Sequence, residues 1–295
     1  MKVLNYGSLN VDYVYSVDHI IVGGETQHSS KLEVFSGGKG LNQSIALAKA
    51  GVSVYHAGIV GSDGDILLYA CKEAGVNTKY IRRLPVKGGH TMIQVDKNAQ
   101  NCIILYGGTN QMQTREFVDE VLADFGEGDY LLLQNEINML DYIIDQAYEK
   151  KMKIVMNPSP FDDKLNTCDL GKIYLFLLNE IEGEQITGYK DKDQILDAMA
   201  EKFPNARFVL TLGSDGAVYY DGKEKVFQDI FKVKAVDTTA AGDTFTGYFI
   251  AAVIEGRSVQ EALRMAAKAS SIAVSRPGAT PSIPAMDEVK RELGM

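Results

Sequence analysis

The sequence predicts an α/β protein with a doubly wound, mainly parallel sheet that is flanked by helices and carries a small β-sheet lid. Apolar strand-like runs alternate with helix-like segments from residue 130 onward. This alternation is typical of βαβ units and of a parallel sheet covered on both faces. Two stretches, about 13–35 and 88–106, interrupt it with short β-type runs. We expect them to form the lid of a single domain over residues 1–295.

The N-terminal part of the chain contains short elements that glycines separate. Gly51 and Gly75 each follow a helix-like run, in the position where glycine commonly ends a helix. The expected elements are a strand over 2–7, β-type runs at 13–15 and 31–35, a helix over 44–50 opened by glycines, a strand over 52–60, a helix over 65–74, and a hairpin of 91–95 with 102–106.

The C-terminal part contains longer elements in regular alternation. No internal repeat, low-complexity tract or linker divides it. The expected strands lie over 130–134, 153–157, 173–178 and 208–211, the expected helices over 138–150 and 181–187, and a further helix starts near Asp243.

Composition and charge argue against several classes of protein. The formal net charge is -9, which argues against nucleic acid or an anionic membrane as the main partner. No apolar run approaches the length of a transmembrane helix. Cys71, Cys102 and Cys168 form no CxxC pair, and no signal peptide is apparent, so we expect a cytoplasmic protein. The histidines do not have the spacing of metal ligands.

The stretch from Asp237 to Thr246 carries the strongest chemical signal. It reads Asp-Thr-Thr-Ala-Ala-Gly-Asp-Thr-Phe-Thr, and its small residues precede an expected helix start. The unpaired N–H groups and the dipole of a helix start form a cradle for an anion. Asp243 would lie in that cradle, where it could accept a proton from a hydroxyl while the cradle holds a phosphoryl group.

Polar residues recur where the predicted strands end. Ligands of open α/β sheets bind at the carboxyl ends of the strands. Each residue alone could be a turn residue or a helix cap, but their recurrence favours a binding rim. The residues are Asn10 and Asp12 after the first strand, Gln134 to Glu136, Asn157, Asn179 and Glu182, and Thr211 to Gly216.

Two short motifs each have a structural and a functional interpretation. The glycines of 37–42 allow a ligand to approach the backbone, and both ends of the Asn42 amide can bind hydroxyls. Flexible glycines suit a helix start equally well, and the motif is neither a Walker A sequence nor a dinucleotide fingerprint. Asn179 and Glu182 could supply oxygen ligands for Mg²⁺ or form a helix capping box.

Residues 37–43 and 237–245 together resemble the two signatures of the ribokinase-like (PfkB) carbohydrate kinases. The similarity covers essentially the whole chain and includes the segments 24–26, 157–160, 179–182, 211–216 and 275–284. The resemblance implies transfer of the γ-phosphate of ATP to a sugar hydroxyl, with Mg²⁺ and a K⁺ activator. Conversion of ribose to ribose 5-phosphate is the first expectation. It also implies a homodimer that forms by pairing of two β-lids.

The resemblance implies a role for each matching residue. The catalytic residues are Asp243, as the base, and Ala240, Ala241 and Gly242, as the anion hole. The sugar-binding residues are Asn10, Asp12, Gly38, Lys39, Asn42, Glu136 and Asp243. The nucleotide-binding residues are Asn179, Glu182, Thr211, Gly213, Ser214, Gly216 and Gly242, with Glu182 also associated with Mg²⁺. The monovalent-cation residues are Asp237, Thr239, Ala273, Arg276, Gly278 and Ser282, acting largely through backbone carbonyls.

The sequence departs from the family pattern at two points. Thr246 stands where the members that phosphorylate ribose usually carry Asn, and Ala266-Ala267 replaces a His or Asn that often contacts the nucleoside. Fructose, a ketodeoxy sugar acid and a nucleoside therefore stay open as substrates, with Lys39 or Lys97 as the partner of an acid group. A sugar sensor without catalysis is a further alternative. A nicotinamide oxidoreductase is disfavoured because the glycine fingerprint is missing.

Overall fold

A nine-stranded sheet forms the centre of the fold in the computed structural model, which describes residues 1–98 and 100–295. In spatial order its strands are β13 (Lys225–Gln228), β12 (Ala217–Tyr220), β11 (Arg207–Thr211), β10 (Leu175–Asn179), β9 (Lys153–Asn157), β8 (Tyr130–Gln134), β1 (Val3–Tyr6), β4 (Val54–Val60) and β5 (Asn77–Arg83). All neighbours from β11 to β5 pair in parallel, and β12 and β13 add an antiparallel edge. The predicted doubly wound, mainly parallel sheet is confirmed.

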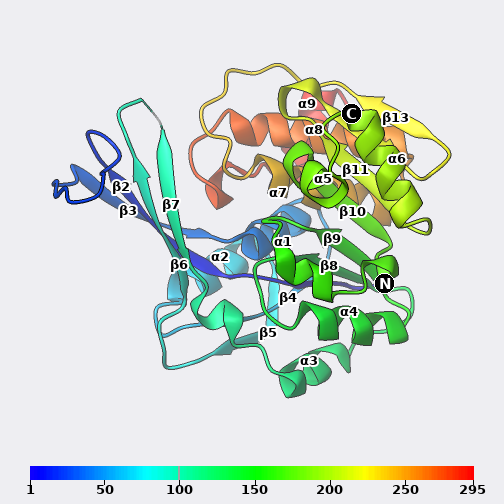
Figure 1. The fold of residues 1–295 in the computed structure, drawn as a ribbon, viewed down its shortest axis with the longest axis horizontal. Helices are drawn as coiled ribbons and strands as arrows, with labels where there is room; N and C mark the ends of the chain where they lie inside the picture. The colour runs from blue at the N-terminus through cyan, green and yellow to red at the C-terminus, as the bar shows by residue number, and fades with distance from the viewer. Residues whose placement is uncertain (99) are drawn as a thin grey trace.

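Helices cover both faces of this sheet (Figure 1). Successive strand residues point to opposite faces, so Val3 joins one buried cluster and Leu4 the other. The first face packs against α1 (Lys39–Lys49), α2 (Asp65–Ala74), α7 (Ala241–Ile254), α8 (Val259–Val274) and α9 (Met286–Leu293). The second packs against α3 (Arg115–Leu122), α4 (Leu140–Glu149) and α6 (Lys192–Lys202), and α5 (Glu180–Thr187) connects β10 to α6.

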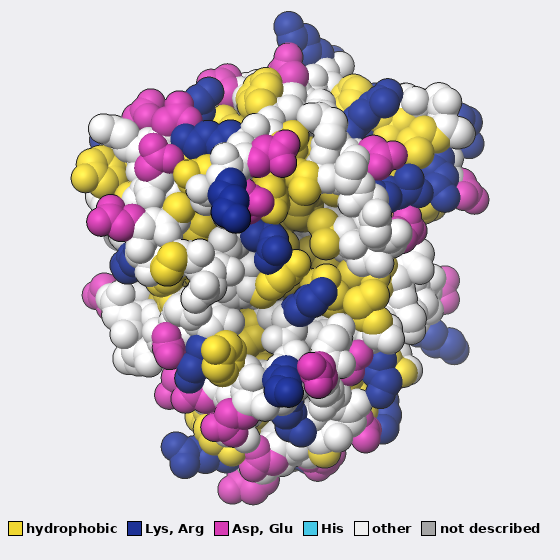
Figure 2. Space-filling model, turned by 90° about the vertical axis from the view of Figure 1, so that its right-hand side faces the viewer, with side chains coloured by type: hydrophobic (Ala, Val, Ile, Leu, Met, Phe, Trp, Pro, Cys, Tyr) yellow, Lys and Arg dark blue, Asp and Glu magenta, His cyan; other side chains and the backbone are white. Residues whose placement is uncertain are grey.

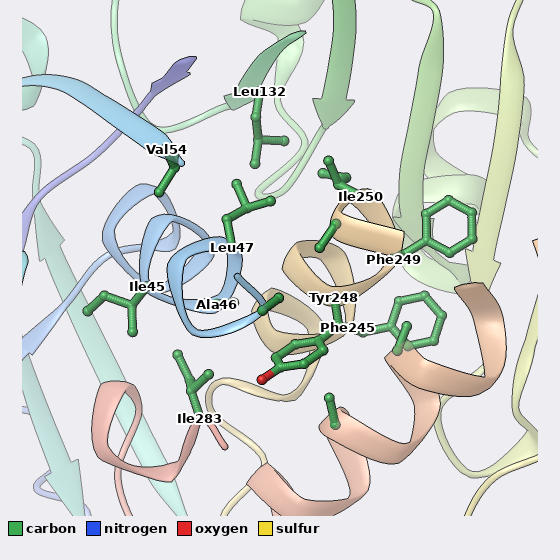
Figure 3. Close-up of a cluster of buried hydrophobic side chains, with 14 of the residues drawn as sticks. Ile45, Ala46, Leu47, Val54, Leu132, Phe245, Tyr248, Phe249, Ile250 and Ile283 are labelled. Carbon is green, nitrogen blue, oxygen red and sulfur yellow. The ribbon is translucent and has the colours of Figure 1, made fainter. Parts of the chain in front are cut away.

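Helices α1 and α7 pack against each other on the first face, although they come from opposite ends of the chain. Figure 3 shows Ala46 and Leu47 of α1 beside Tyr248 and its neighbours on α7. A Cβ atom on Gly247 would lie 2.4 Å from the Cβ of Ala46, so only glycine allows this separation of the helices. The contact fixes the first turn of α7 relative to the first turns of α1.

A second, four-stranded sheet projects from the body and forms the predicted lid (Figure 1). Its order is β3 (Lys31–Gly37), β2 (Asn10–Ser16), β6 (Gly89–Val95) and β7 (Asn101–Tyr106). Strands β2 and β6 pair in parallel, and the two outer pairs are antiparallel. Because β2 begins at Asn10, both Asn10 and Asp12 belong to the lid. They follow β1 as expected, and the lid begins at Asn10 rather than near residue 13.

Several elements outside the predicted ones complete the sheet and its helical layers. These are β5, β12 and β13, and the helices α3, α6, α8 and α9. The predicted helix over 65–74 and the predicted strands over 130–134 and 153–157 have the bounds that the structure shows. Across the described parts of the chain, no helix combines the length and the hydropathy that crossing a membrane requires.

Candidate active site

The first turn of α7 presents Asp243 and free backbone amides to a cavity. Helix α7 begins at Ala241 with Ala240 as its N-cap, and no side chain caps it. The amide of Ala241 donates to the Thr238 carbonyl at 3.2 Å. Ala240 and Ala241 therefore shape the turn, and Gly242 and Asp243 line the cavity. A helix start of this kind favours an anion.

Two side chains of α1 hold the carboxylate of Asp243. Asn42 donates from Nδ2 to Oδ2 at 2.8 Å, and Gln43 donates from Nε2 to Oδ1 at 2.9 Å. The Asp243 side chain is only 6% exposed, so these two bonds set its orientation. The Oδ1 atom of Asn42 is buried and has no partner among the described residues. This atom can accept a hydrogen bond from a ligand hydroxyl.

The cavity beside Asp243 has a volume of about 190 Å³. Its walls combine strand ends, the α1 start and the α7 start, as expected for a site at the carboxyl edge of an α/β sheet. The lining residues are Lys39, Asn157, Ser159, Leu177, Leu178, Asn179, Glu182, Thr211, Thr239, Gly242, Asp243 and Thr246. Thr246, which departs from the family pattern, thus lies in the cavity wall.

Lys39 and Glu136 place opposite charges next to each other at the α1 start. Glu136 accepts a hydrogen bond from the Lys39 amide at 3.0 Å and a second one from the Ser8 hydroxyl. Burial acts to lower the pKa of Lys39, but Asp243, Glu136 and Glu182 outweigh it and raise this pKa. Lys39 is therefore a positive charge at neutral pH. Burial raises the pKa of Glu136, and Lys39 opposes that rise.

Asn10 and Asp12 lie beside the glycines that precede α1. A Cβ atom on Gly38 would be 3.1 Å from the Asn10 amide nitrogen, and one on Gly37 would collide with the Asp12 carboxylate. Each polar side chain has a partner that the sequence analysis did not identify. Asn110 donates to Asn10 Oδ1 at 2.7 Å, and Thr91 donates to Asp12 Oδ1 at 2.6 Å. Burial raises the pKa of Asp12 to about 6, against the Thr91 hydrogen bond.

Asn179 and Glu182 form a capping box and also line the cavity. The Asn179 side chain accepts from the Ile181 and Glu182 amides at 2.8 and 3.0 Å. Glu182 Oε2 accepts from the Asn179 amide at 2.8 Å. The capping-box interpretation is confirmed. The cap uses Asn179 Oδ1 and Glu182 Oε2, and both residues also line the cavity.

The other expected nucleotide residues follow strand β11. Thr211 ends this strand and lines the cavity. Gly213 and Ser214 lie on the exposed 3-10 turn at Gly213–Asp215, and Gly216 follows with a φ of 94°. This turn lies outside the cavity lining. Ala266 is fully buried in the core, so its side chain is not available to a base.

The expected cation residues bring two chain segments together. Asp237 accepts from the Thr239 amide and the Gly278 amide, both at 2.9 Å. Burial acts to raise the pKa of Asp237, but these bonds and the Thr239 hydroxyl outweigh it and lower this pKa. The Ala273 carbonyl accepts from the Arg276 amide at 3.0 Å, and the Ser282 hydroxyl donates to the Ala279 carbonyl. The Arg276 guanidinium is paired with Glu288, and because a guanidinium is itself a cation without an acceptor, the backbone carbonyl of Arg276 is the group that could bind a cation.

Side-chain chemistry limits the metals that this site suits. Within residues 1–98 and 100–295, no group of three His, Cys, Asp or Glu residues could hold a metal. The available donors are carboxylate, hydroxyl and backbone oxygens near Asp237 and Glu182. Such donors fit hard cations that keep part of their coordination from water or a ligand.

Comparisons with known proteins identify the family to which the chain is similar. The family model described as "pfkB family carbohydrate kinase" matches residues 1–286. Ribokinase from Haemophilus influenzae is 34% identical, with 96% of this chain and 95% of that protein covered. Ribokinase from Staphylococcus aureus is 33% identical over 98% of this chain and 99% of that protein. The structure of Arabidopsis thaliana ribokinase complexed with ribose and ATP is 29% identical, covers 100% of this chain and 99% of its own, and superposes with a TM-score of 0.89.

The fold and the site define a carbohydrate kinase, a phosphotransferase with an alcohol group as acceptor. The chain belongs to the pfkB family, and the relatives named above are ribokinases.

Proposed function

We propose that this protein transfers the γ-phosphoryl group of ATP to the primary hydroxyl of ribose and so forms ribose 5-phosphate. One observation carries the proposal: the Asp243 carboxylate lies at the open start of α7, beside the cavity, and Asn42 and Gln43 hold it in place. A base and an anion cradle on one helical turn suit the transfer of a phosphoryl group to a hydroxyl. The full-length similarity to ribokinases supports ribose as the substrate that provides this hydroxyl.

Asp243 orients the sugar hydroxyl and accepts its proton as the new bond forms. Phosphoryl transfer passes through a loose transition state, so positioning and charge stabilisation contribute most of the rate. The amides of Gly242 and Asp243 face the transferring group, and the Lys39 ammonium adds a positive charge beside the same cavity. The unpartnered Oδ1 of Asn42 accepts a neighbouring hydroxyl of the sugar.

Charge in the cavity supports a requirement for Mg²⁺. Asp243 and Glu182 line it together with Lys39 as the cation, and a triphosphate brings several more negative charges. Bound Mg²⁺ supplies the neutralising charge for the phosphates. Glu182 Oε1 is the donor that would hold the ion, directly or through water, because Oε2 is engaged in the capping box.

A monovalent cation beside Asp237 would order the turn that precedes α7. Asp237 already ties Thr239 to Gly278, and Thr239 lines the cavity. K⁺ at the carbonyls of Ala273, Arg276 and Gly278 would add to this constraint. The expected consequence is a fixed direction of the Gly242 and Asp243 amides.

The charges near Asn10 favour a neutral sugar over a sugar acid. Asp12 and Glu136 are carboxyl groups in the expected sugar pocket. Lys39 already faces three carboxylates. Lys97 pairs with Asp18 at 3.2 Å at the tip of the lid hairpin. An acidic substrate would therefore meet net repulsion.

The lid supports a homodimer. On one of its faces, the exposed apolar side chains include Leu32, Val34, Met92 and Ile104, which are 43% to 61% exposed. They lie over β3, β6 and β7, and Met92 and Ile104 line a groove of about 280 Å³. The face opposite the lid has hydrophobic, acidic and basic side chains interspersed (Figure 2). A second copy of the same apolar sheet is the occupant that such a surface suits.

Nucleotide-dependent turnover against a panel of acceptors tests the proposed function. The panel contains ribose, 2-deoxyribose, fructose, a ketodeoxy sugar acid and adenosine, each with ATP, Mg²⁺ and K⁺. We expect the highest kcat/KM with ribose and a 5-phosphate product by NMR. Higher kcat/KM with another acceptor would replace ribose by that substrate. Ribose binding without any ADP release would support the sugar sensor instead.

A further inference from the structure

A network of buried, hydrogen-bonded polar side chains connects the central strands of the sheet to Asp243. Asn5 lies on β1, His56 on β4 and Gln134 on β8, and each is fully buried. They share the sheet face of Val3, Val54 and Leu132, which is otherwise apolar and packs against α1. Burying polar groups in such a layer costs free energy unless they are hydrogen-bonded, and among the described residues the side-chain nitrogen and oxygen atoms of these three residues are hydrogen-bonded except Gln134 Oε1. Their bonds converge on Gln43, one of the two side chains that hold Asp243.

Each hydrogen bond of this network has a defined donor and a defined acceptor. The Gly40 carbonyl can only accept, so the group of Asn5 that lies 2.7 Å from it is the amide nitrogen. Asn5 Oδ1 therefore faces Gln134 and accepts from its Nε2 at 3.0 Å. The same Nε2 donates to Gln43 Oε1 at 2.6 Å. This leaves Gln43 Nε2 to donate to Asp243 Oδ1 at 2.9 Å.

A side branch of this hydrogen-bond network, formed by Ser44 and His56, is also uncharged. Asn5 also donates to the Ser44 hydroxyl at 2.8 Å, and Ser44 lies 2.8 Å from His56 Nδ1. Burial lowers the pKa of His56 to about 4, so at neutral pH Nδ1 accepts from Ser44 and Nε2 donates to the Gly7 carbonyl, 3.3 Å away. Asp243 is therefore the charged end of an otherwise uncharged network.

We infer that Gln43 and Gln134 are positioning residues for phosphoryl transfer, which act by fixing the donor end of the Gln43 amide toward the Asp243 carboxylate. A glutamine amide can rotate by half a turn at small cost, and the rotated form would place an oxygen against the carboxylate. Gln134 prevents that rotation because its Nε2 occupies Gln43 Oε1. The backbone of α1, through Gly40 and Asn5, sets Gln134 in turn. Gln134 influences the reaction without touching the substrate or Asp243.

This inference rests on the proposed kinase function, and its test is a double-mutant cycle. The variants are Gln43→Met, Gln134→Met and the combination, because Met keeps the side-chain length and removes the amide. We expect Gln43→Met to lower kcat about tenfold, as for loss of a hydrogen bond to a charged group. Gln134→Met should lower kcat by a smaller factor. The double variant should match Gln43→Met, since Gln134 acts only through Gln43.

Two further measurements separate positioning from general damage. Ribose affinity, measured by calorimetry without nucleotide, should stay within about twofold, so that the loss falls on kcat rather than on binding. Gln113 provides the matched control. It is another buried glutamine, 4% exposed, which accepts from the Tyr6 hydroxyl and, among the described residues, makes no hydrogen bond to Asn5, Gln134 or Gln43. Gln113→Met should lose stability and retain kcat.

Crystal structures of the single variants give a readout that does not depend on turnover. In each, the Asp243 carboxylate should rotate away from its orientation in the parent protein. If the parent protein turns over no acceptor, the proposed function fails, and the carboxylate orientation still decides the positioning role. An unchanged carboxylate with full kcat in Gln43→Met, or multiplicative losses in the double variant, would overturn the inference. If Gln43→Met does not fold, kcat and the orientation of the Asp243 carboxylate in Gln134→Met decide the inference by the same criteria.

Discussion

Asn42 Nδ2 on α1 lies 2.8 Å from Asp243 Oδ2 on α7, although 201 positions separate the two residues in the chain. The bond connects the two segments that sequence analysis singled out independently. The distance between the two side chains is short because α1 and α7 approach closely at Ala46 and Gly247. The geometry between the proposed base, Asp243, and the proposed sugar-binding residue, Asn42, therefore depends on how two helices pack, and the first predictions follow from it.

Removing the carboxylate of Asp243 should abolish most of the catalysis and leave sugar binding in place. We expect Asp243→Ala to lower kcat by at least about 10²-fold, the usual contribution of a positioned base. The measurements are kcat with ribose and ATP, and ribose affinity by calorimetry. Asp197→Ala, at an exposed carboxylate of α6, is the control and should be neutral. Turnover near that of the parent protein in Asp243→Ala would refute the assignment.

A methyl group on Gly247 should force α1 and α7 apart. In Gly247→Ala the new Cβ would lie 2.4 Å from that of Ala46, and such overpacking costs about 1–3 kcal/mol. Because the shift also separates Asn42 from Asp243, kcat should fall together with the free energy of unfolding. Urea denaturation and steady-state kinetics measure the two effects. Gly126→Ala, where a Cβ meets nothing within 4 Å, should change neither by much.

Asp12 should make the protein less stable as pH rises from about 4 to 6. Burial raises its pKa from 3.8 to about 6, so in this window the folded state holds a proton that the unfolded state has released. Stability then falls with rising pH. Asp12→Asn removes the titration and keeps an acceptor for Thr91. This variant should gain about 2 kcal/mol over the parent protein at pH 7.5 and much less at pH 4. Equal stability differences at the two pH values would contradict the prediction.

Potassium should activate the enzyme more strongly than sodium does. The carbonyls beside Asp237 suit a large monovalent cation, and ordering of this segment acts on the α7 start through Thr239. Initial rates in K⁺ and Na⁺ salts at equal ionic strength measure the effect. Asp237→Ala should lose the difference between the two ions. Identical rates for the parent protein in both salts, with contaminating cations removed, would eliminate the proposed cation site.

A charge on the lid should separate the proposed dimer. Ile104 is 61% exposed on β7 and lines the lid groove. Ile104→Glu should convert the dimer to a monomer in sedimentation velocity, because an unpaired carboxylate would be buried between two apolar sheets. Tyr148→Glu, at a residue of α4 that is 53% exposed, is the control and should leave the oligomeric state unchanged. A monomeric parent protein would refute the lid interface.

Local patterns in the sequence predicted the helices that a glycine ends and the strands that are continuous apolar runs. The helix over 65–74 has a glycine immediately after it, and strand β8 is a continuous apolar run. Strand β5 was missed because most of its residues are polar, with Tyr80 and Ile81 as the exceptions, so the segment resembles a surface loop. The segment is a strand because it pairs with β4 at the sheet edge. A local sequence pattern contains no information about this tertiary contact.

The same distinction applies to the site. Short motifs identified Asp243, Lys39 and Asn42, which lie together as expected. Asn110 and Thr91 were missed because each contacts its partner across about a hundred or about eighty positions of chain. Gln43 lies inside a recognised motif, but its proposed positioning role depends on a hydrogen bond from Gln134, and this partner follows from tertiary contact alone.

The long separation between α1 and α7 also has a consequence for the protein during its synthesis. At ~5–20 residues per second, Asp243 is made on the order of 10–40 s after Asn42. Throughout this interval the nascent chain contains the α1 segment but lacks the proposed catalytic carboxylate and the residues of the anion cradle. An unfinished chain that ends before residue 243 therefore lacks part of the proposed active site.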